Sequence, residues 1–402
     1  MDTHSSRERH FSGDLNKESG ARLQRTKPAN PSKLGIFLAC PLRYLLETER
    51  PAIDRVGDHP TAFLGTAVHH AAEVLRRQGH ARSPGCVEVL EKCLGRLLSD
   101  SNRSGLLISW MLSRYGKNCL LSRVQFLSQA GFAKSLAERF PAARGAASLR
   151  TGTRTTSIPI GQERWLASPV LDVAGRADAI YWAGNGQLRI VDFKTGSIRD
   201  SDGSPNRTYV MQVAAYGLIA RQLDSKAGIS IELLGITDRW ISSLDASLVR
   251  AVEQLLDNFR NALPLGLMVS SADLAQRGEH CSSCSYRPSC QLYCGFMEHR
   301  MAVDHSRSGF DVVGELLDVN NDDEFFTMRL RLANGSIIRI SRIPGFLLSM
   351  IQRSSGGRVA GFGLRSLEVC RPGAIPQNFS VMDVQHPRNS AFQSYFRLSS
   401  LE

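Results

Sequence analysis

Apolar residues follow a helical spacing in the first third of the chain. Segment 63–78 repeats apolar residues from Leu64 to Leu75 at intervals of three or four positions, which predicts an amphipathic helix. The stretch at 86–140 keeps a helical, Leu-rich pattern with few β-branched runs. We therefore expect a helical insertion at about 80–150.

A shorter helical pattern lies upstream, at 33–47 (KLGIFLACPLRYLLE). Proline cannot continue the helical hydrogen-bond ladder and restrains the residue before it, so we expect an interruption at Cys40–Pro41. Residues 1–32 are polar, mixed in charge and without apolar periodicity. This pattern predicts a flexible leader.

The pattern changes to short strands from about residue 151. The predicted strands and helices are a strand at 155–160 (TTSIPI), strands at 173–182 (VAGRADAIYW) and 187–193 (QLRIVDF), a helix at 209–222, a strand at 229–237 and a helix at 244–263. Beyond residue 304, further strand-like segments are separated by Asn-Asn-Asp-Asp and Asn-Gly turn signals. The succession predicts an α/β core at 33–300 and a small β-rich C-terminal domain at 301–402.

Composition places the chain among ordinary globular proteins, with 402 residues of which 42% are hydrophobic and 22% charged. No segment has the roughly eighteen apolar residues of a membrane helix, and the start lacks the apolar segment of a signal peptide. We therefore expect a soluble, cytoplasmic protein. The formal net charge of +11 makes nucleic acid a candidate partner. Nine cysteines in a reducing compartment indicate free thiols or metal ligands rather than disulfides.

An acid and a lysine share one face of the predicted strand that ends near residue 193. Side chains two positions apart point to the same side of a strand, so Asp192 and Lys194 lie on one surface and Phe193 packs on the other. The sequence Gly184-Asn185-Gly186 indicates a three-residue hairpin loop. If the hairpin is symmetric about Asn185, Asp178 lies opposite Asp192.

Two carboxylates directly across a strand pair repel each other, and a divalent cation removes that repulsion. Hard cations such as Mg²⁺ bind through one or two carboxylates together with phosphate oxygens. A bound metal would lower the pKa of a water molecule, and Lys194 would orient that water or stabilise a pentacovalent phosphorus. The alternative is a solvated strand face, because Asp-x-Lys is common by chance and a register slip of one residue would separate the acids.

Four motifs in sequence order resemble the PD-(D/E)XK nuclease superfamily, specifically its RecB-like branch. They are GTAVH at 65–69, GRADAI at 175–180, VDFKTG at 191–196 and QVAAY at 212–216. The resemblance implies a restriction-endonuclease-like core, in which helices flank a mixed central sheet. It also implies roles for individual residues: His69, Asp178, Asp192 and the backbone carbonyl of Phe193 as metal ligands, Lys194 as the catalytic lysine, and Gln212 and Tyr216 as supports of the site or contacts to DNA.

Each of these motifs has a structural alternative. His69 is followed by a second histidine, and a helical histidine is commonly a surface or core residue. Tyr216, in an apolar helix, would serve core packing. Glu163 precedes the first clear strand, where this branch often places a further acid, but the sequence does not fix its alignment.

A cysteine-rich loop at 280–294 has the spacing Cys-x2-Cys-x5-Cys at Cys281, Cys284 and Cys290. Three thiolates close together in a loop indicate a metal site. RecB-like iron–sulfur nucleases, including AddB-like and CRISPR-associated members, place one cysteine upstream of the core and three after it. Cys40, in ACPLRY, occupies the upstream position, so the resemblance implies a [4Fe–4S] cluster. The spacing fits Zn²⁺ almost as well, and Cys294 in place of Cys40 would make a local zinc loop.

The resemblance covers about residues 33–294 and implies hydrolysis of DNA phosphodiester bonds with Mg²⁺ or Mn²⁺. The expected substrate is single-stranded DNA or DNA ends, in repair, recombination or defence, with endonuclease and exonuclease action both open. Two alternatives remain: a non-catalytic nucleic-acid-binding or scaffold subunit with a structural zinc loop, and the nuclease subunit of a helicase–nuclease or defence complex. The sequence holds no Gly-x4-Gly-Lys-Ser/Thr phosphate loop, so a helicase partner would supply any ATP-driven unwinding. The C-terminal domain is expected to be a small β-barrel that contacts nucleic acid or a partner.

Overall fold

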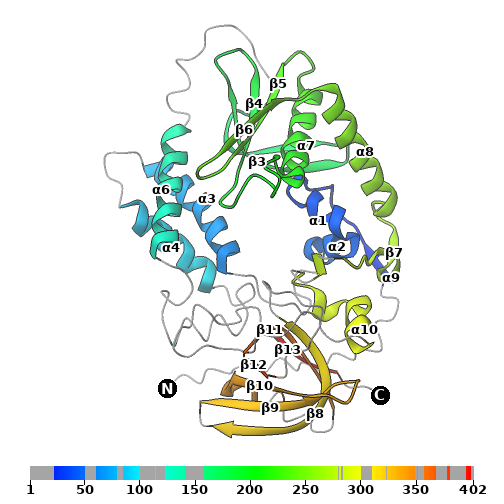
Figure 1. Ribbon diagram of the computed structural model, residues 1–402. Helices are drawn as coiled ribbons and strands as arrows, with labels where there is room; N and C mark the ends of the chain where they lie inside the picture. Colours follow the sequence, from blue (N-terminus) through cyan, green and yellow to red (C-terminus); the bar gives the residue numbers. More distant parts are fainter. Residues whose placement is uncertain are drawn as a thin grey trace, which may run out of the picture.

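The computed structural model is built around a five-stranded mixed sheet (Figure 1). It describes residues 22–49, 60–78, 85–99, 114, 123–140, 158–278, 280–281, 284–299, 310–322, 324–348, 351, 357–367, 378–380 and 395–399. The central strands, in spatial order, are β2 (Gly161–Ser168), β3 (Val173–Trp182), β4 (Leu188–Phe193), β5 (Ile229–Leu234) and β6 (Arg239–Ser243). Strands β4 and β5 are parallel, and the other neighbours are antiparallel.

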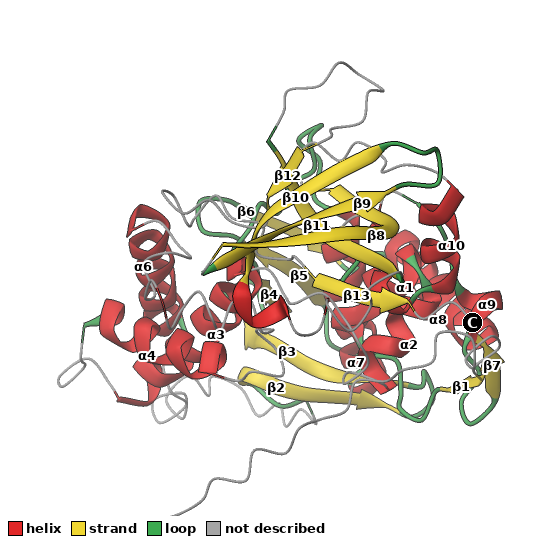
Figure 2. Ribbon diagram, turned by 90° about the horizontal axis from the view of Figure 1, so that it is seen from below, coloured by secondary structure: helices red, strands yellow, loops and turns green. Residues whose placement is uncertain are grey.

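Helices cover both faces of this sheet (Figures 1 and 2). They are α1 (Leu34–Ala39), α2 (Pro41–Glu49), α3 (Pro60–Gln78), α4 (Cys86–Ser99), α6 (Arg123–Arg139), α7 (Arg207–Leu223) and α8 (Ala246–Ala262). Helices α1, α2, α7 and α8 share a core cluster with Leu188 and Ile190 of β4. Helices α3, α4 and α6 form a second core cluster with Val191 and Phe193 of β4. The alternation along β4 follows from the two-residue period of a strand, and the predicted α/β class is confirmed.

Local sequence signals account for several element boundaries. Helix α1 ends before Cys40 and α2 begins at Pro41, as predicted from the missing N–H of proline. Strand β3 has the predicted bounds. The strand predicted at 155–160 is wrong in position, because β2 begins only at Gly161 and residues 158–160 are not in a strand. Pro159 lacks a backbone donor and disfavours pairing there, and residues 155–157 lie outside the described residues.

The predicted flexible leader is wrong for residues 22–32, which are part of the folded core. Strand β1 (Arg22–Gln24) pairs with β7 (Met268–Ser270), and the 3-10 helix η1 (Pro31–Lys33) leads into α1. Arg25 is only 2% exposed, lies over the ring of Phe259 and forms an ion pair with Asp172. The segment shows no apolar periodicity because one of its buried side chains is the charged Arg25. Residues 1–21 lie outside the described part of the chain.

Strands near the C-terminus close a small barrel, as predicted. They are β8 (Phe310–Asp322), β9 (Phe325–Arg331), β10 (Ile337–Pro344), β11 (Arg358–Ser366), β12 (Asn378–Ser380) and β13 (Tyr395–Ser399), with the 3-10 helix η6 (Gly345–Leu347) after β10. Their order is β12-β10-β9-β8-β11-β13, and β12 also pairs with β11, which completes the ring. The expected contact of this barrel with nucleic acid or a partner stays a prediction.

A buried polar network joins the barrel to the cysteine-rich segment. That segment includes α9 (Ser271–Leu274), the 3-10 helix η5 (Arg287–Ser289) and α10 (Gln291–His299). The side chain of Arg287 bonds to both carboxylate oxygens of Asp311, at 2.6 and 3.3 Å, and to the carbonyl of Cys284. Tyr293 and the backbone N–H of Gly363 also donate to Asp311. Within the described residues, no helix has the length and apolar character needed to cross a membrane.

Candidate active site

The site forms where β3 and β4 separate. The pairs from Ala179–Val191 to Trp182–Leu188 follow the predicted hairpin register. Asp178 and Asp192 occupy the next position along the two strands. There the carboxylate of Asp178, instead of a backbone carbonyl, accepts a hydrogen bond from the N–H of Phe193 at 2.6 Å. The separation of the strands therefore leaves room for two carboxylates at the end of the pairing.

Glu163 adds a third carboxylate from β2. Because Gln162 pairs with Ala179 and Arg164 with Ala177, Glu163 sits opposite Asp178. Its φ of 52° lies in the left-handed region, which is costly for a residue with a side chain and which recurs at functional sites. The sequence pattern does not align this residue, because no local signal fixes the register that brings it to Asp178.

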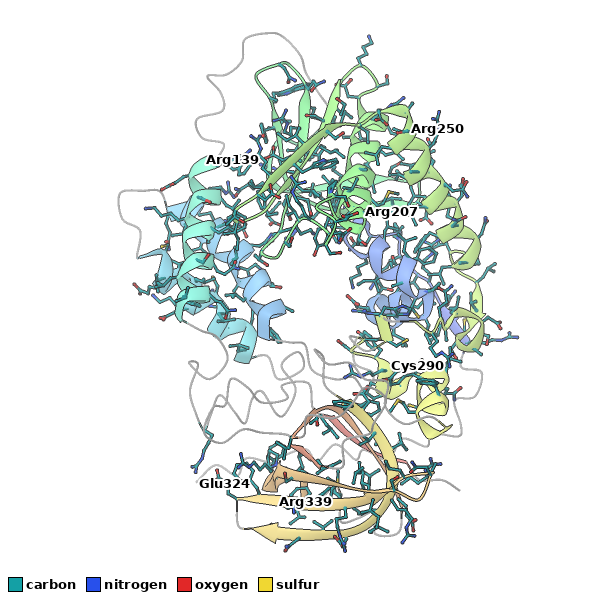
Figure 3. All side chains as sticks on the ribbon, in the orientation of Figure 1. Arg139, Arg207, Arg250, Cys290, Glu324 and Arg339 are labelled. Carbon is teal, nitrogen blue, oxygen red and sulfur yellow. The ribbon has the colours of Figure 1, made fainter. Side chains whose placement is uncertain are left out.

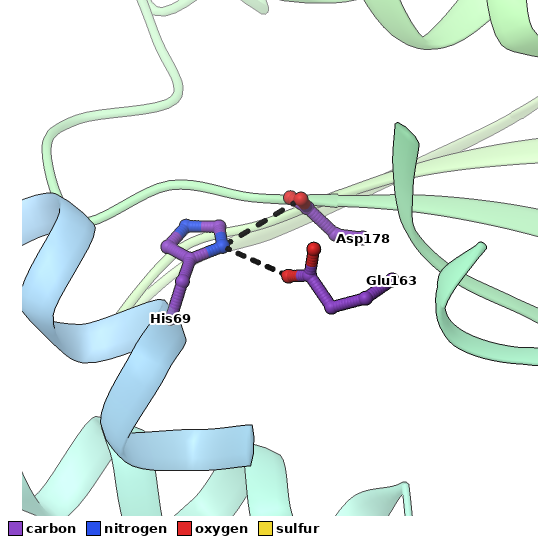
Figure 4. Close-up of side chains that lie close together, drawn as sticks. All are labelled: His69, Glu163 and Asp178. Carbon is purple, nitrogen blue, oxygen red and sulfur yellow. Dashed lines mark ion pairs between the residues drawn. The ribbon is translucent and has the colours of Figure 1, made fainter. Parts of the chain in front are cut away.

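His69 reaches the carboxylates from α3 (Figure 4). Its Nδ1 lies 3.6 Å from Oδ1 of Asp178 and 3.8 Å from Oε1 of Glu163. One turn earlier, Gly65 packs so closely on the segment after β4 that a Cβ there would lie 3.0 Å from Oγ1 of Thr195. In the Gly-x-x-x-His motif, the glycine therefore lets helix α3 approach the segment after β4, and the histidine one turn later faces the carboxylates. The potential ligand atoms of His69, Glu163 and Asp178 all lie within 4.8 Å of one another.

Negative charge dominates the electrostatics of this cluster. Burial would lower the pKa of His69, but Asp178, Glu163 and Asp192 outweigh it and raise that pKa from 6.5 to about 9. Burial, with a contribution from Asp192, raises the pKa of Asp178 to about 6, against the opposing effect of His69. Both shifts indicate that the cluster retains a proton when no other cation is present.

Asp192 and Lys194 form a second, more buried part of the site. The ammonium Nζ of Lys194 lies 2.8 Å from Oδ2 of Asp192 and donates to Oε1 of Gln212 at 3.0 Å. It also lies 4.5 Å from the centre of the Tyr209 ring. Burial would lower the pKa of Lys194, but Asp192 outweighs it and the pKa is raised, so the lysine remains a cation.

Gln212 and Tyr216 support the site from α7. Nε2 of Gln212 donates to Oδ1 of Asp192 at 2.6 Å, and it also reaches Ser32, whose Oγ lies 3.0 Å from the Tyr216 hydroxyl. Tyr216 is only 1% exposed, so its hydroxyl contacts Ser32 inside the core and is not open to a substrate. A Cβ on Gly175 would lie 2.8 Å from that hydroxyl, so glycine is required there. Ser32 was missed because it falls within the predicted leader.

The residues fit a hard divalent cation. Carboxylate oxygens and a histidine nitrogen suit Mg²⁺ or Mn²⁺. Oδ2 of Asp192 is buried and, apart from the Lys194 ammonium 2.8 Å away, has no hydrogen-bond partner among the described residues. A buried carboxylate oxygen in this state has a lone pair available for a cation. The carboxylates of Glu163 and Asp178, with that of Asp192 close enough to raise the pKa of Asp178, would otherwise repel one another.

Cys40 lies near three cysteines of the loop at 280–294, of which Cys290 is labelled in Figure 3. Cys40, between α1 and α2, interacts electrostatically with the thiols of Cys281, Cys284 and Cys290. The N–H of Gly278 donates to Sγ of Cys281 at 3.5 Å. Burial raises the pKa of Cys290 to about 12, so its thiolate needs a metal or another positive charge. Among the described residues, no three of these thiols are as close as the His69 cluster atoms.

Comparisons with known proteins identify the family. A protein-family model described as the PD-(D/E)XK nuclease superfamily matches residues 28–291, more than half of the 402-residue chain. A crystal structure of a protein named SSO0001 is 15% identical, covers 58% of this chain and 96% of its own, and has a TM-score of 0.22. That of a "Putative exonuclease" from Eubacterium rectale is 13% identical, covers 44% of this chain and 66% of its own, and has a TM-score of 0.22. The curated proteins include no match.

The region matched by the family model contains strands β3 and β4 with Asp178 and Asp192. It also contains His69 on α3, Lys194 and Gln212. The central mixed sheet with helices on both faces agrees with the restriction-endonuclease-like fold that the four motifs imply. The chain belongs to the PD-(D/E)XK nuclease superfamily.

Proposed function

We propose that the protein is a metal-dependent DNA nuclease that hydrolyses phosphodiester bonds of single-stranded DNA or DNA ends. The observation that carries the proposal is the meeting of the Glu163 and Asp178 carboxylates at His69, with Asp192 close enough to raise the pKa of Asp178 and paired with a cationic Lys194. Membership of a nuclease superfamily supports the reaction class. The net charge of +11 supports a polyanionic substrate.

Mg²⁺ or Mn²⁺ would be held by His69, Glu163, Asp178, Asp192 and the backbone carbonyl of Phe193. When bound, the ion would neutralise charge on the scissile phosphate and make a water molecule more acidic. Glu163 joins the predicted set because its carboxylate lies 3.8 Å from the same histidine nitrogen that faces Asp178.

Lys194 acts as a fixed positive charge. Its raised pKa keeps the ammonium protonated, which makes it a donor to a phosphate oxygen and unsuitable as a general base. Gln212 holds both partners of the pair, because it donates to Asp192 and accepts from Lys194. Gln212 and Tyr216 are therefore positioning residues, which act through Asp192 and Lys194.

Cleavage assays on the purified full chain test the proposal. Asp192→Asn and Lys194→Met should abolish Mg²⁺- or Mn²⁺-dependent cleavage of single-stranded DNA and preserve the circular dichroism spectrum. Asp257→Asn, which removes an exposed carboxylate from α8, is the matched control and should cleave like the parent protein. DNA binding without cleavage by the parent protein would instead support the non-catalytic alternative.

We also propose that Cys40, Cys281, Cys284 and Cys290 hold a [4Fe–4S] cluster. The support is that Cys40 interacts with all three loop thiols, although it lies far upstream in sequence. The cluster would be a structural clamp between α1, α2 and the end of the core.

Anaerobic purification tests the cluster. The protein should be brown, with absorbance at about 400 nm, and Cys40→Ala should lose this colour. Cys86→Ala, at a cysteine of α4, should keep it. Colourless protein with stoichiometric zinc would reject the cluster in favour of the zinc loop.

A further inference from the structure

A solvent-exposed tryptophan lies beside the carboxylate cluster. Trp165 is 63% exposed, and its direct partner across the β2–β3 pair is Arg176, whose side chain is 59% exposed. Their neighbours Leu166 and Ala177 are buried in the core cluster on the α7 side. Trp165 and Arg176 therefore project from the opposite face of these two strands.

This pair is continuous with the proposed active site. Trp165 follows Glu163 by two residues, about 7 Å along the strand. Arg176 connects the two, because its Nε forms an ion pair with Oε2 of Glu163 at 2.7 Å. The Nη groups of Arg176 make no hydrogen bond to the described residues, so the guanidinium can still donate to a further anion. Strand β2 is the outermost strand of its sheet, which leaves the pair accessible from the edge (Figure 2).

Core packing does not explain Trp165. A tryptophan contributes to stability mainly by burying its large ring, and this ring remains largely in solvent. Single-stranded nucleic acid is bound by aromatic rings, on which bases stack, and by cations, which attract the phosphate backbone. An exposed aromatic ring beside a guanidinium with free N–H groups combines the two. The neighbouring carboxylates and Lys194 fix where the phosphate of such a strand would be cleaved.

We propose that Trp165 and Arg176 form a stacking platform that binds the single-stranded substrate next to the cleaved phosphate. A nucleobase stacks on the indole ring of Trp165, and a backbone phosphate binds the free Nη groups of Arg176. The inference rests on the proposed nuclease function and names the residues that would select its single-stranded substrate. The face of a base is accessible to a side chain only when the base is unstacked, so the platform selects single strands over intact duplex.

The test measures binding separately from cleavage. Fluorescence anisotropy follows a labelled oligothymidine and a labelled duplex of equal length, with the full chain and with Ca²⁺ in place of Mg²⁺. Trp165→Ala should weaken single-strand binding about 5- to 150-fold and leave duplex binding unchanged, and Trp165→Phe should restore most of the affinity. Arg176→Ala should weaken binding and reduce the slope of log affinity against log salt by about 0.7.

Two variants serve as matched controls. Val170→Ala removes another exposed apolar side chain close to β2, and Arg250→Ala removes an exposed arginine from the outer side of α8 (Figure 3). Both should bind like the parent protein. Cleavage of the same oligothymidine with Mg²⁺ or Mn²⁺ is measured in parallel, and Trp165→Ala should raise KM with little change in kcat.

The outcomes distinguish the two proposals. Unchanged single-strand affinity in Trp165→Ala overturns the platform, even if the parent protein cleaves DNA. Trp165-dependent single-strand binding by a parent protein that does not cleave supports the platform and overturns the nuclease activity. Equal loss of single-strand and duplex binding in Trp165→Ala also overturns the platform, because the bases within a duplex are stacked on one another and offer the indole ring no free face.

Discussion

The charge on His69 should make the stability of the metal-free protein depend on pH. Its Nδ1 faces two carboxylates at 3.6 and 3.8 Å, and they outweigh burial to raise the pKa of His69 to about 9. The folded state therefore holds the proton more tightly than the unfolded chain. This contribution to the free energy of unfolding is fully present below pH 6.5 and is lost as the pH rises through about 9.

The magnitude follows from the pKa difference. A rise from 6.5 to about 9 in the pKa of His69 corresponds to about 3 kcal/mol of unfolding free energy. Asp178 contributes in a separate window, because its pKa is raised from 3.8 to about 6 and its stabilisation is lost between these values. Measurements above pH 6.5 therefore separate the histidine from Asp178. The loop cysteines titrate at higher pH, but they do so in the parent protein and in a His69 variant alike.

Urea unfolding in EDTA at pH 6.5 and pH 9.5 measures this effect. Between these values the parent protein should lose about 3 kcal/mol more than His69→Ala. His70→Ala, at the exposed neighbouring histidine, should retain the full pH dependence of the parent protein. Parallel pH profiles for the parent protein and His69→Ala would refute the argument, because they would mean that residue 69 carries no bound proton at neutral pH.

Three further predictions follow from the same contacts. The affinity for Mn²⁺ in calorimetric titration should rise about tenfold per pH unit below pH 9, because the site histidine must lose its proton to bind metal, and a flat profile would contradict this. Glu232 is fully buried and accepts hydrogen bonds from the half-exposed Arg139 and Arg239, so Glu232→Gln should lower the free energy of unfolding by about 1.5–3 kcal/mol, and a loss near zero in urea titrations would show that these charged contacts do not stabilise the fold. Gly175→Ala should displace the Tyr216 hydroxyl and lower kcat more than it raises KM, whereas an unchanged kcat would show that Tyr216 does not position the site.

The sequence alone determined the elements whose causes are local. The bounds of β3, the break between α1 and α2 and the register about the 184–186 loop all follow from strand alternation, proline geometry and turn residues. These features depend on residues a few positions apart, so they can be recognised without knowledge of the fold. The same pattern identified Asp192 and Lys194 as neighbours on one strand face.

Tertiary structure decided which distant groups complete the site. Glu163 meets Asp178 only through the pairing of β2 with β3, and Ser32 reaches Gln212 only because residues 22–32 fold onto the core. Cys40 approaches the cysteine-rich loop because α1 and α2 pack beside the end of the core. In each case the partner is far away in the sequence, and its position depends on the packing of whole elements. Local pattern therefore specifies each strand and helix, whereas long-range packing selects the side chains that share one charged cluster.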